Sequence, residues 1–412
     1  MKWVALITTV VGLILAARVA ADDWPEFRGP TGQGIAPAVK LPIAWGTSKN
    51  IAWKQEIPGR GWSSPVVYQG RVYLTTSVPA SGGDQSLRAL CLDAANGTIL
   101  WDREIFHEAT APAIHSKNSH ASPTPLVSGQ RLYVHFGRQG TACSDLTGKV
   151  LWRNHELTYT PVHGNGGSPM LAGDLLVFSC DGGDQAFIAA LDTATGRVRW
   201  KTERSVDAAK RFSFSTPLLI AVNGRQQIVS PASNAVYAYD PTSGEEIWRV
   251  RYDGYSVIPR PVYGQGLLFI CTGYEAPSLL AIRPDGKGDV TETHVAWRTN
   301  RAAPHTPSPL LVGEELYLVS DNGVASCLDG RTGRVHWTKR LGGSYSASPL
   351  YADGKIYFQN EDGLGTVIQA GRHFQALARN DLEERSLASC AAAGNALFIR
   401  TQKHLYRVQI PQ

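Results

Sequence analysis

Three histidines at matching positions have the clearest capacity for chemistry in this sequence. His120, His163 and His305 each lie a few residues before a proline that opens a short apolar run. If those runs are equivalent elements of a repeat, the three imidazoles converge, as the ligands of a zinc or copper site must. Hydrogen bonding of these rings to loop backbone around a water-filled channel would explain them as well. Both interpretations stay open, with His115 as a fourth candidate ligand.

Other polar side chains share these segments. Arg60, Lys117, Arg211 and Arg260 would favour a small anionic ligand, because guanidinium and ammonium groups bind carboxylates and phosphates directly. Solvation of a protein surface is the alternative explanation. The expected ligand-binding residues are Arg60, Lys117, Asn118, His120, His163, Asn165, Arg211, Tyr255, Arg260, His305 and Tyr345.

Tryptophan reveals the elements that must position these residues. Seven of them are separated by 48, 51, 48, 48, 49 and 40 residues: Trp53, Trp101, Trp152, Trp200, Trp248, Trp297 and Trp337. Four of the seven close the phrase Asp-x-x-x-Gly-x-x-x-Trp, as in Asp192, Gly196 and Trp200. An Asp side chain caps a tight turn and Gly accepts a positive φ, so the phrase predicts strand, turn and strand. A period of this length is typical of a repeat array.

Each unit also begins with a proline, followed by apolar residues, a glycine and a β-rich run. Seven units start in this way, and an eighth has Cys390 in the place of the proline. The eighth unit stops soon after Tyr406, without a tryptophan strand of its own. Residues 51–56 look like such a strand, and no complete unit precedes them. The N-terminal strand is therefore predicted to complete the last unit.

Four short strands per period, with almost no helical periodicity, predict an all-β fold. We expect residues 50–412 to form an eight-bladed β-propeller of four-stranded antiparallel blades, the last blade closed by the N-terminal strand. Each tryptophan would dock between neighbouring blades. Leu377 stands where the seventh blade should have its tryptophan, so that blade should dock less tightly. The loops leading into the innermost strands would share the mouth of a central channel, which gathers the candidate residues.

The Ala-Leu-Asp-x-x-x-Gly-x-x-x-Trp phrase, at residues 190–200, resembles the PQQ-like (quinoprotein-type) repeat. That repeat family includes quinone-dependent alcohol and sugar dehydrogenases and the non-catalytic propeller BamB of the outer-membrane assembly machinery. The segment from Asp23 to Pro30 resembles the start of a group of exported bacterial propellers of uncertain function. The resemblance implies a propeller fold over nearly the whole mature chain.

The sequence favours a binding or scaffold function over catalysis. The dehydrogenases use a longer chain, an adjacent-cysteine disulfide, bound calcium and an Asp base. This chain has no adjacent cysteines and no match to the calcium ligands, so PQQ is not an expected cofactor. The alternative function is an oxidoreductase or other enzyme with a polar, histidine-containing site at the channel mouth, dependent on PQQ or a metal. The expected partner is a protein of the cell envelope, in the setting of outer-membrane protein assembly.

The N-terminus has the pattern of a secretory signal peptide over residues 1–21: a basic start, an apolar run and small residues before Asp22. The run is short for a membrane span, so we expect a mature chain without a transmembrane helix, located in the periplasm or secreted. Residues 22–49 would form an N-terminal leader segment. Loss of Lys2 and Arg18 reduces the net charge from +5 to +3, too small a surplus to indicate nucleic acid as a partner.

Six cysteines in an exported chain raise the question of disulfides. Cys91, Cys143 and Cys327 occupy one slot of the repeat, two residues before the turn Asp. Equivalent slots of adjacent blades lie too far apart for a disulfide, which needs Cα atoms within about 7 Å. Six free thiols are therefore predicted.

Overall fold

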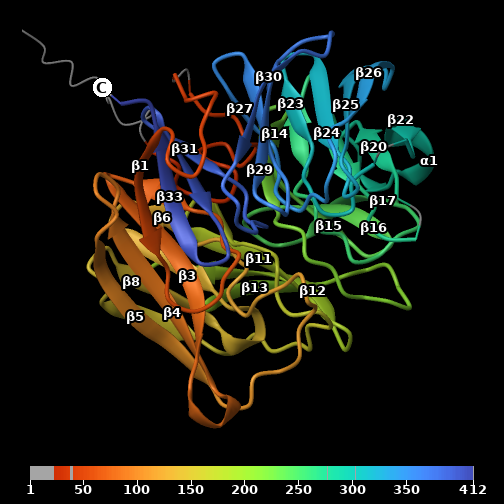
Figure 1. Cartoon of the computed structure of the whole chain (residues 1–412). Coiled ribbons are helices and arrows are strands. Elements are labelled where there is room, and N and C mark those ends of the chain that lie inside the picture. The colour runs from red at the N-terminus through yellow and green to blue at the C-terminus, as the bar shows by residue number, and fades with distance from the viewer. Residues whose placement is uncertain (1–22, 38–39, 276, 302, 412) are drawn as a thin grey trace, which may run out of the picture.

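The chain forms a ring of β-sheets. The computed structural model describes residues 23–37, 40–275, 277–301 and 303–411, and these residues form eight sheets, seven with four strands and one with five. The sheets stand as blades around a central axis (Figure 1). Within each blade the paired strands are antiparallel, except where the short β21 adds to blade 4 in parallel. The predicted eight-bladed propeller of antiparallel blades is confirmed.

The strands are short and follow the repeat. From the axis outward, blade 1 contains β2 (Val66–Tyr68), β3 (Arg71–Pro79), β4 (Gln85–Asp93) and β5 (Ile99–Glu108), and blade 2 contains β6 (Leu126–Ser128), β7 (Arg131–His135), β8 (Thr141–Asp145) and β9 (Val150–Asn154). Blade 3 contains β10 (Met170–Ala172), β11 (Leu175–Asp181), β12 (Ala186–Asp192) and β13 (Val198–Glu203). Blade 4 contains β14 (Leu218–Val222), β15 (Arg225–Ala232), β16 (Ala235–Tyr239) and β17 (Glu246–Arg251), with β21 (Gly288–Asp289). Blade 5 contains β18 (Val262–Gly264), β19 (Leu267–Cys271), β20 (Leu279–Ile282) and β22 (Val295–Thr299), and blade 6 contains β23 (Leu310–Val312), β24 (Glu315–Val319), β25 (Val324–Asp329) and β26 (Val335–Arg340). Blade 7 contains β27 (Leu350–Ala352), β28 (Lys355–Gln359), β29 (Leu364–Gln369) and β30 (Ala376–Asp381). Blade 8 contains β31 (Ala391–Ala393), β32 (Ala396–Arg400), β33 (His404–Gln409) and β1 (Ile51–Glu56). One short helix, α1 (Thr291–His294), follows β21.

The ring closes through the N-terminal strand, as predicted. β1 pairs antiparallel with β33, with Ile51 opposite Val408 and Lys54 opposite Tyr406. Figure 1 shows the red β1 beside the blue β33. The first and last strands of the propeller therefore share one blade, and neither can leave without opening the ring.

The tryptophan phrase locks each blade to the next. In blade 1 the carboxylate of Asp93 accepts the N–H of Ala95, and Gly97 has a φ of 80°. Trp53 of blade 8 lies flat on that turn, so a Cβ at Gly97 would come within 2.7 Å of its ring. The Trp53 indole donates to the Ala94 carbonyl at 3.0 Å. The same bond to the next blade recurs from Trp101, Trp152, Trp200, Trp297 and Trp337.

Blade 4 departs from this rule. The Trp248 indole donates to Gln227 of its own blade at 2.8 Å, and β21 covers the strand where the next turn would lie. Blade 7 has Leu377 at the tryptophan position, and Trp45 of the leader packs there instead, its ring near Gly365 and its backbone N–H bonded to Asn380. Weaker docking of blade 7 stays a prediction.

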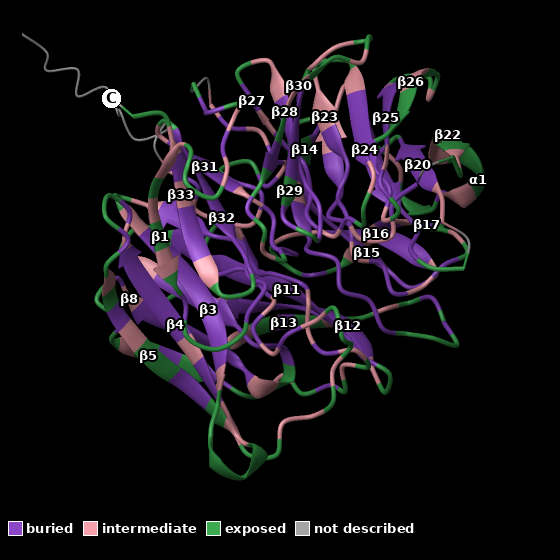
Figure 2. Ribbon diagram, viewed as in Figure 1, coloured by how far each residue is buried: buried purple, intermediate pink, exposed green. Residues whose placement is uncertain are grey.

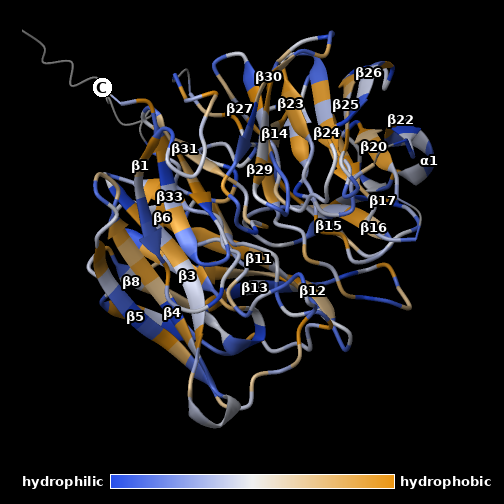
Figure 3. Ribbon diagram, in the orientation of Figure 1, coloured by the Kyte–Doolittle hydropathy of each residue, from blue (hydrophilic) through white to orange (hydrophobic). Residues whose placement is uncertain are grey.

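The hydrophobic core lies between blades. One cluster joins Met170 and Trp200 of blade 3 to Tyr237 of blade 4, and the others are similar. Figure 2 shows buried residues along the inner and middle strands and exposed residues on outer strands such as β26. Figure 3 shows the matching concentration of hydrophobic residues on the strands. Core packing thus holds the loops of successive blades around one axis.

The structure bears on some of the remaining predictions about the cysteines, the membrane and the N-terminus. All six cysteines are free thiols, five of them buried. Within the described ranges no helix is long and apolar enough to cross a membrane. The signal peptide predicted at residues 1–21 lies outside the described residues.

Candidate functional site

A cavity of about 370 Å³ occupies the centre of the ring. All eight blades contribute lining residues, and so does Phe27 of the leader. Four of the predicted ligand-binding residues line it, namely Lys117, Asn118, His163 and Tyr255, and so does His115. Ligand pockets commonly fall between about 300 and 1,000 Å³. The cavity is therefore the candidate functional site.

A ring of hydroxyl groups forms the cavity wall. The second residue before the inner strand is Ser or Thr in seven blades: Ser64, Thr124, Ser168, Thr216, Ser308, Ser348 and Ser389. Each hydroxyl accepts the backbone N–H of the equivalent residue in the preceding blade, at 2.9 to 3.2 Å. The eighth position is Arg260 of blade 5, which breaks the hydroxyl ring at one point.

The leader closes the channel on the far side of this ring. Trp24 pairs with Val67 of β2, and Ile35 forms a bridge to Tyr351 of β27. Between them the carbonyl of Pro25 accepts the N–H of Val127, and Gln33 accepts the N–H of Tyr263. Residues 23–36 thus cross from blade 1 to blade 7 along the inner strands. The channel is a blind pocket with Phe27 at its floor.

Two buried guanidinium groups fix the leader. Arg260 donates to the Phe27 carbonyl at 2.6 Å and to the Glu26 carboxylate at 3.2 Å. Arg28 donates to the carbonyls of Gln33 and Pro309. A Cβ at Gly32, where φ is 67°, would lie 2.4 Å from Arg260, so only glycine permits this approach. Burial, with the neighbouring Arg260, lowers the pKa of Arg28 to about 9, so Arg28 stays charged at neutral pH.

Aromatic and histidine side chains surround the mouth. The His115 and His163 ring centroids lie 5.5 Å apart, and Phe212 packs against His163 on the other side at 5.2 Å. Tyr255 and Tyr274 lie 6.3 Å apart. Burial, with the adjacent His115, lowers the pKa of His163, which is therefore neutral at pH 7.

A salt bridge spans the mouth. The Lys117 ammonium, from the loop before blade 2, contacts the Glu361 carboxylate of blade 7 at 2.7 Å. Glu361 is buried and also accepts the hydroxyl of Ser346. Asn118 donates to the His163 carbonyl and so joins the loops before blades 2 and 3. The charge of Lys117 is thus balanced by Glu361. Lys117 therefore attracts an incoming anion less strongly than the sequence analysis predicts.

The other predicted ligand residues lie elsewhere. Arg60 is exposed and donates to the Ser116 carbonyl, and Arg211 pairs with the exposed Asp207. Tyr345 is buried in the core between blades 6 and 7, and the amide oxygen of Asn165 accepts the Tyr159 hydroxyl behind the mouth. Arg260 belongs to the floor and not to the rim. The anion-binding rim expected from these cations is therefore not assembled.

The metal site predicted at His120, His163 and His305 is not formed. His305 packs edge-on against Tyr274 beside a separate cavity with Asp321, whereas His163 packs against His115. His120 is half-buried and does not line the channel. Within the described ranges no three His, Cys, Asp or Glu side chains come together as metal ligands. The loops before the inner strands differ in length. Histidines at matching positions of the repeat therefore lie at different depths along the channel.

Sequence reasoning missed the hydroxyl ring and the floor. The signal for the ring was present, because a Ser or Thr precedes the repeated proline in six blades and Arg260 stands out in the same register. The leader has no repeat partner and no periodicity, so its course through the ring had no comparable signal.

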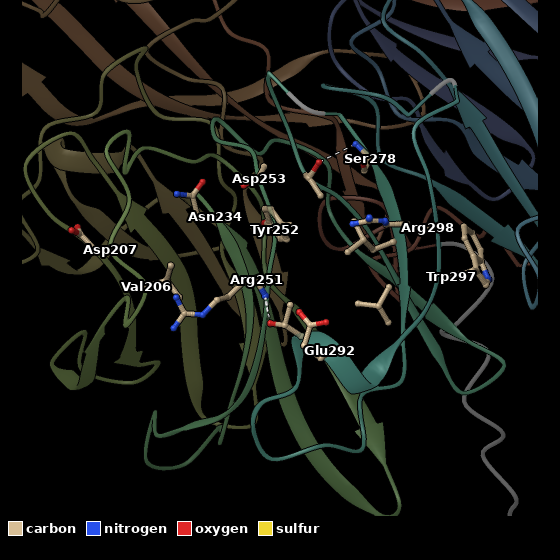
Figure 4. A pocket seen from close by; sticks show the side chains of 14 residues that line it. Val206, Asp207, Asn234, Arg251, Tyr252, Asp253, Ser278, Glu292, Trp297 and Arg298 are labelled. Carbon is tan, nitrogen blue, oxygen red and sulfur yellow. Dashed lines mark hydrogen bonds between the residues drawn. The ribbon is translucent and has the colours of Figure 1, made fainter.

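A larger cavity of about 760 Å³ lies between blades 4 and 5, where the tryptophan lock is missing (Figure 4). Its lining mixes the carboxylates of Asp207, Asp253 and Glu292 with Arg251 and Arg298. Figure 4 shows these side chains spread along the two blades without a common focus. It gathers none of the predicted site residues, so the central pocket stays the candidate.

Comparison with known proteins agrees with the fold. A family model described as "Outer membrane protein assembly factor BamB" matches residues 40–155, 88–211, 184–289 and 232–404. A curated protein of that description from Shewanella oneidensis is 25% identical over 219 residues, 48% of this chain and 51% of that protein. This chain thus spans about half the length of the curated relative it matches.

Two solved structures share the architecture. BamB from Moraxella catarrhalis superposes with a TM-score of 0.64 at 13% identity, covering 88% of this chain and 98% of that one. The computationally designed Ika8 protein gives 0.61 at 12% identity, over 86% of this chain and 98% of the other. At such identities these likenesses show the fold alone. The family matches, however, run without a gap from residue 40 to residue 404. The chain belongs to the family of outer membrane protein assembly factor BamB, with its PQQ-like propeller repeats.

Proposed function

We propose that this protein is a non-catalytic scaffold propeller for outer-membrane protein assembly, exported to the periplasm and bound to a protein partner of the cell envelope. The observation that carries the proposal is the family match through all eight blades, residues 40–404. Supporting it, tryptophan side chains lock neighbouring blades together and β1 closes the ring, which makes a rigid platform for surface loops.

The mouth face is the surface best suited to the partner. Tyr274 is 42% exposed there, beside Tyr255 and the ion pair of Lys210 with Glu275. Tyrosine is enriched at protein interfaces because it buries a large area with little loss of side-chain entropy. The far face is taken up in part by the leader.

The test is the composition of the outer membrane in the native host. Deleting the gene should lower the amount of folded outer-membrane proteins, measured by quantitative mass spectrometry of the membrane fraction. A copy with Tyr274→Ala should restore them poorly. A copy with Leu151→Ala is the matched control, because Leu151 is similarly exposed at 46% but lies on outer strand β9. Unchanged outer-membrane protein levels in the deletion strain would exclude the proposal.

An enzyme at the mouth is the second candidate, favoured by one observation. His163 lines the pocket next to His115, and its lowered pKa leaves it neutral and able to accept a proton at pH 7. Incubation with PQQ, calcium and simple alcohols in a dye-reduction assay tests it. Turnover that is lost in His163→Ala would replace the scaffold proposal, and absence of turnover would remove an enzyme of this kind.

A further inference from the structure

We propose that the blind central pocket binds a small organic anion, with its carboxylate or sulfonate head on the hydroxyl ring and its apolar body among the aromatic side chains of the mouth. The pocket opens at the mouth that was proposed above as the protein-binding surface and shares Tyr255 and Tyr274 with it, but ligand binding does not depend on that function. Three features carry the proposal: the hydrogen-bond donors of the wall, the charge beneath the floor and the lining of the mouth.

The wall offers donors in excess of acceptors. Each ring hydroxyl already accepts a backbone N–H, as described above, so a lone pair of its oxygen is occupied. Ser348 donates its proton to Ser308. For Ser64, Thr124, Ser168, Thr216, Ser308 and Ser389 no described residue accepts the hydroxyl proton, although each is less than 10% exposed. Buried hydroxyl protons need an acceptor, and their common position around the axis favours a single group with several acceptor oxygens.

The charge under the ring is positive. Arg260 donates to the carbonyl of Pro217 and Arg28 to that of Pro309, so both guanidinium groups lie one residue below the hydroxyl layer. Glu26 is the carboxylate paired with Arg260, and two of the Arg28 nitrogens have no partner within the described ranges. Two cations against one carboxylate leave a net positive charge in a buried site, which favours an anion above it.

The lining of the pocket fits the body of such a ligand. Trp62, Phe214, Tyr255 and Tyr274 line it between the ring and the mouth. No Asp or Glu is found among the described lining residues, and the Glu361 carboxylate at the mouth is paired with Lys117. A metal cation would need a converging set of carboxylate, imidazole or thiolate ligands, and the described residues bring no such set together. The oxygens of a neutral sugar accept hydrogen bonds, but a neutral sugar would leave the buried positive charge without a counterpart.

The test is calorimetric titration of the mature protein with four probes. Benzoate and benzenesulfonate should bind saturably. Benzamide, the neutral isostere of benzoate, should bind at least about tenfold more weakly, because hydrogen bonds to a charged acceptor are the stronger ones. Acetate, which has the head group without the ring, should also bind more weakly than benzoate. Absence of saturable binding, or equal affinity for benzamide and benzoate, would overturn the proposal.

Variants at one blade place the head group. Thr216→Val removes a ring donor and should reduce benzoate affinity several-fold, whereas Thr216→Ser should retain it. Ser215→Ala is the matched control, since that hydroxyl donates to the Pro259 carbonyl and does not line the pocket. Loss of a buried hydroxyl lowers the melting temperature in Thr216→Val and Ser215→Ala alike, but only the former should change affinity. Equal affinities in all three variants would contradict the site.

Discussion

The two ends of the central channel are built from different parts of the chain. At the far end, residues 23–36 cross the inner strands and are held by Arg28, Arg260 and backbone bridges to blades 1 and 7. At the mouth, loops of successive blades leave aromatic faces and hydroxyl protons around a cavity. The N-terminal segment therefore seals one end and closes the ring through β1, and recognition is left to the other end.

The largest effect is expected when the segment that closes the ring is removed. Deleting residues 50–57 takes away β1, its pairing with β33 and the Trp53 lock on blade 1. We expect loss of the cooperative unfolding transition, measured by calorimetry, because the edges of blade 8 are then unpaired. Replacing the exposed hairpin tip at residues 80–84 by Asn-Gly is the control and should leave the transition in place. A stable deletion product would show that closure is dispensable.

The floor can be tested at one side chain. Arg260→Met leaves the Glu26 carboxylate and the Phe27 carbonyl without their buried donor, which should cost about 3–5 kcal/mol in the free energy of unfolding. Arg211→Met, on the protein surface, breaks a pair of exposed groups and should change the free energy of unfolding by less than about 0.5 kcal/mol. Urea unfolding measures both. If Glu26→Gln with Arg260→Met costs as much as the two single changes added together, the two side chains are not coupled.

Arg260 also shows which features of the structure can be predicted from the sequence and which cannot. The repeat predicts the ring, because Asp, Gly and Trp have local roles that recur from blade to blade, and it predicts closure because residues 51–56 resemble a tryptophan strand. The depth of a loop residue in the channel depends on loop length and on what fills the hole. Arg260 was therefore expected at the rim and lies at the floor, paired with a leader that has no repeat partner. Likewise Tyr345 enters the core between blades 6 and 7, whereas Tyr255, two blades earlier in the chain, reaches the pocket.

Two histidines, one in the interior of a blade and one at the mouth, differ in burial and therefore in their effect on pH-dependent stability. His135 is 1% exposed in β7, and burial lowers its pKa to about 3, whereas the half-buried His163 is less constrained. The folded pKa lies below the unfolded value of about 6.5, so the unfolded state binds the proton first and stability falls as pH decreases. Between pH 7 and pH 4.5 this group should cost roughly 2.5 kcal/mol. Unfolding of His135→Phe should lose that part of the pH dependence, and His163→Phe should retain it. A parallel pH profile for His135→Phe and the unmodified protein would contradict this assignment.

The smallest effect is expected at the bridge across the mouth. Lys117 is 43% exposed at its side chain, so Lys117→Met should change the free energy of unfolding by no more than about 1 kcal/mol, mostly because the buried Glu361 loses its cation. Lys210→Met, which breaks a pair with both members exposed, is the matched control and should have almost no effect. Adding Glu361→Gln to Lys117→Met should recover most of the loss, since no buried charge is then left without a partner, and urea unfolding measures each variant. A loss of stability in Lys117→Met well above that expected for a surface ion pair would instead mean that this bridge at the mouth, like the floor, stabilises the fold.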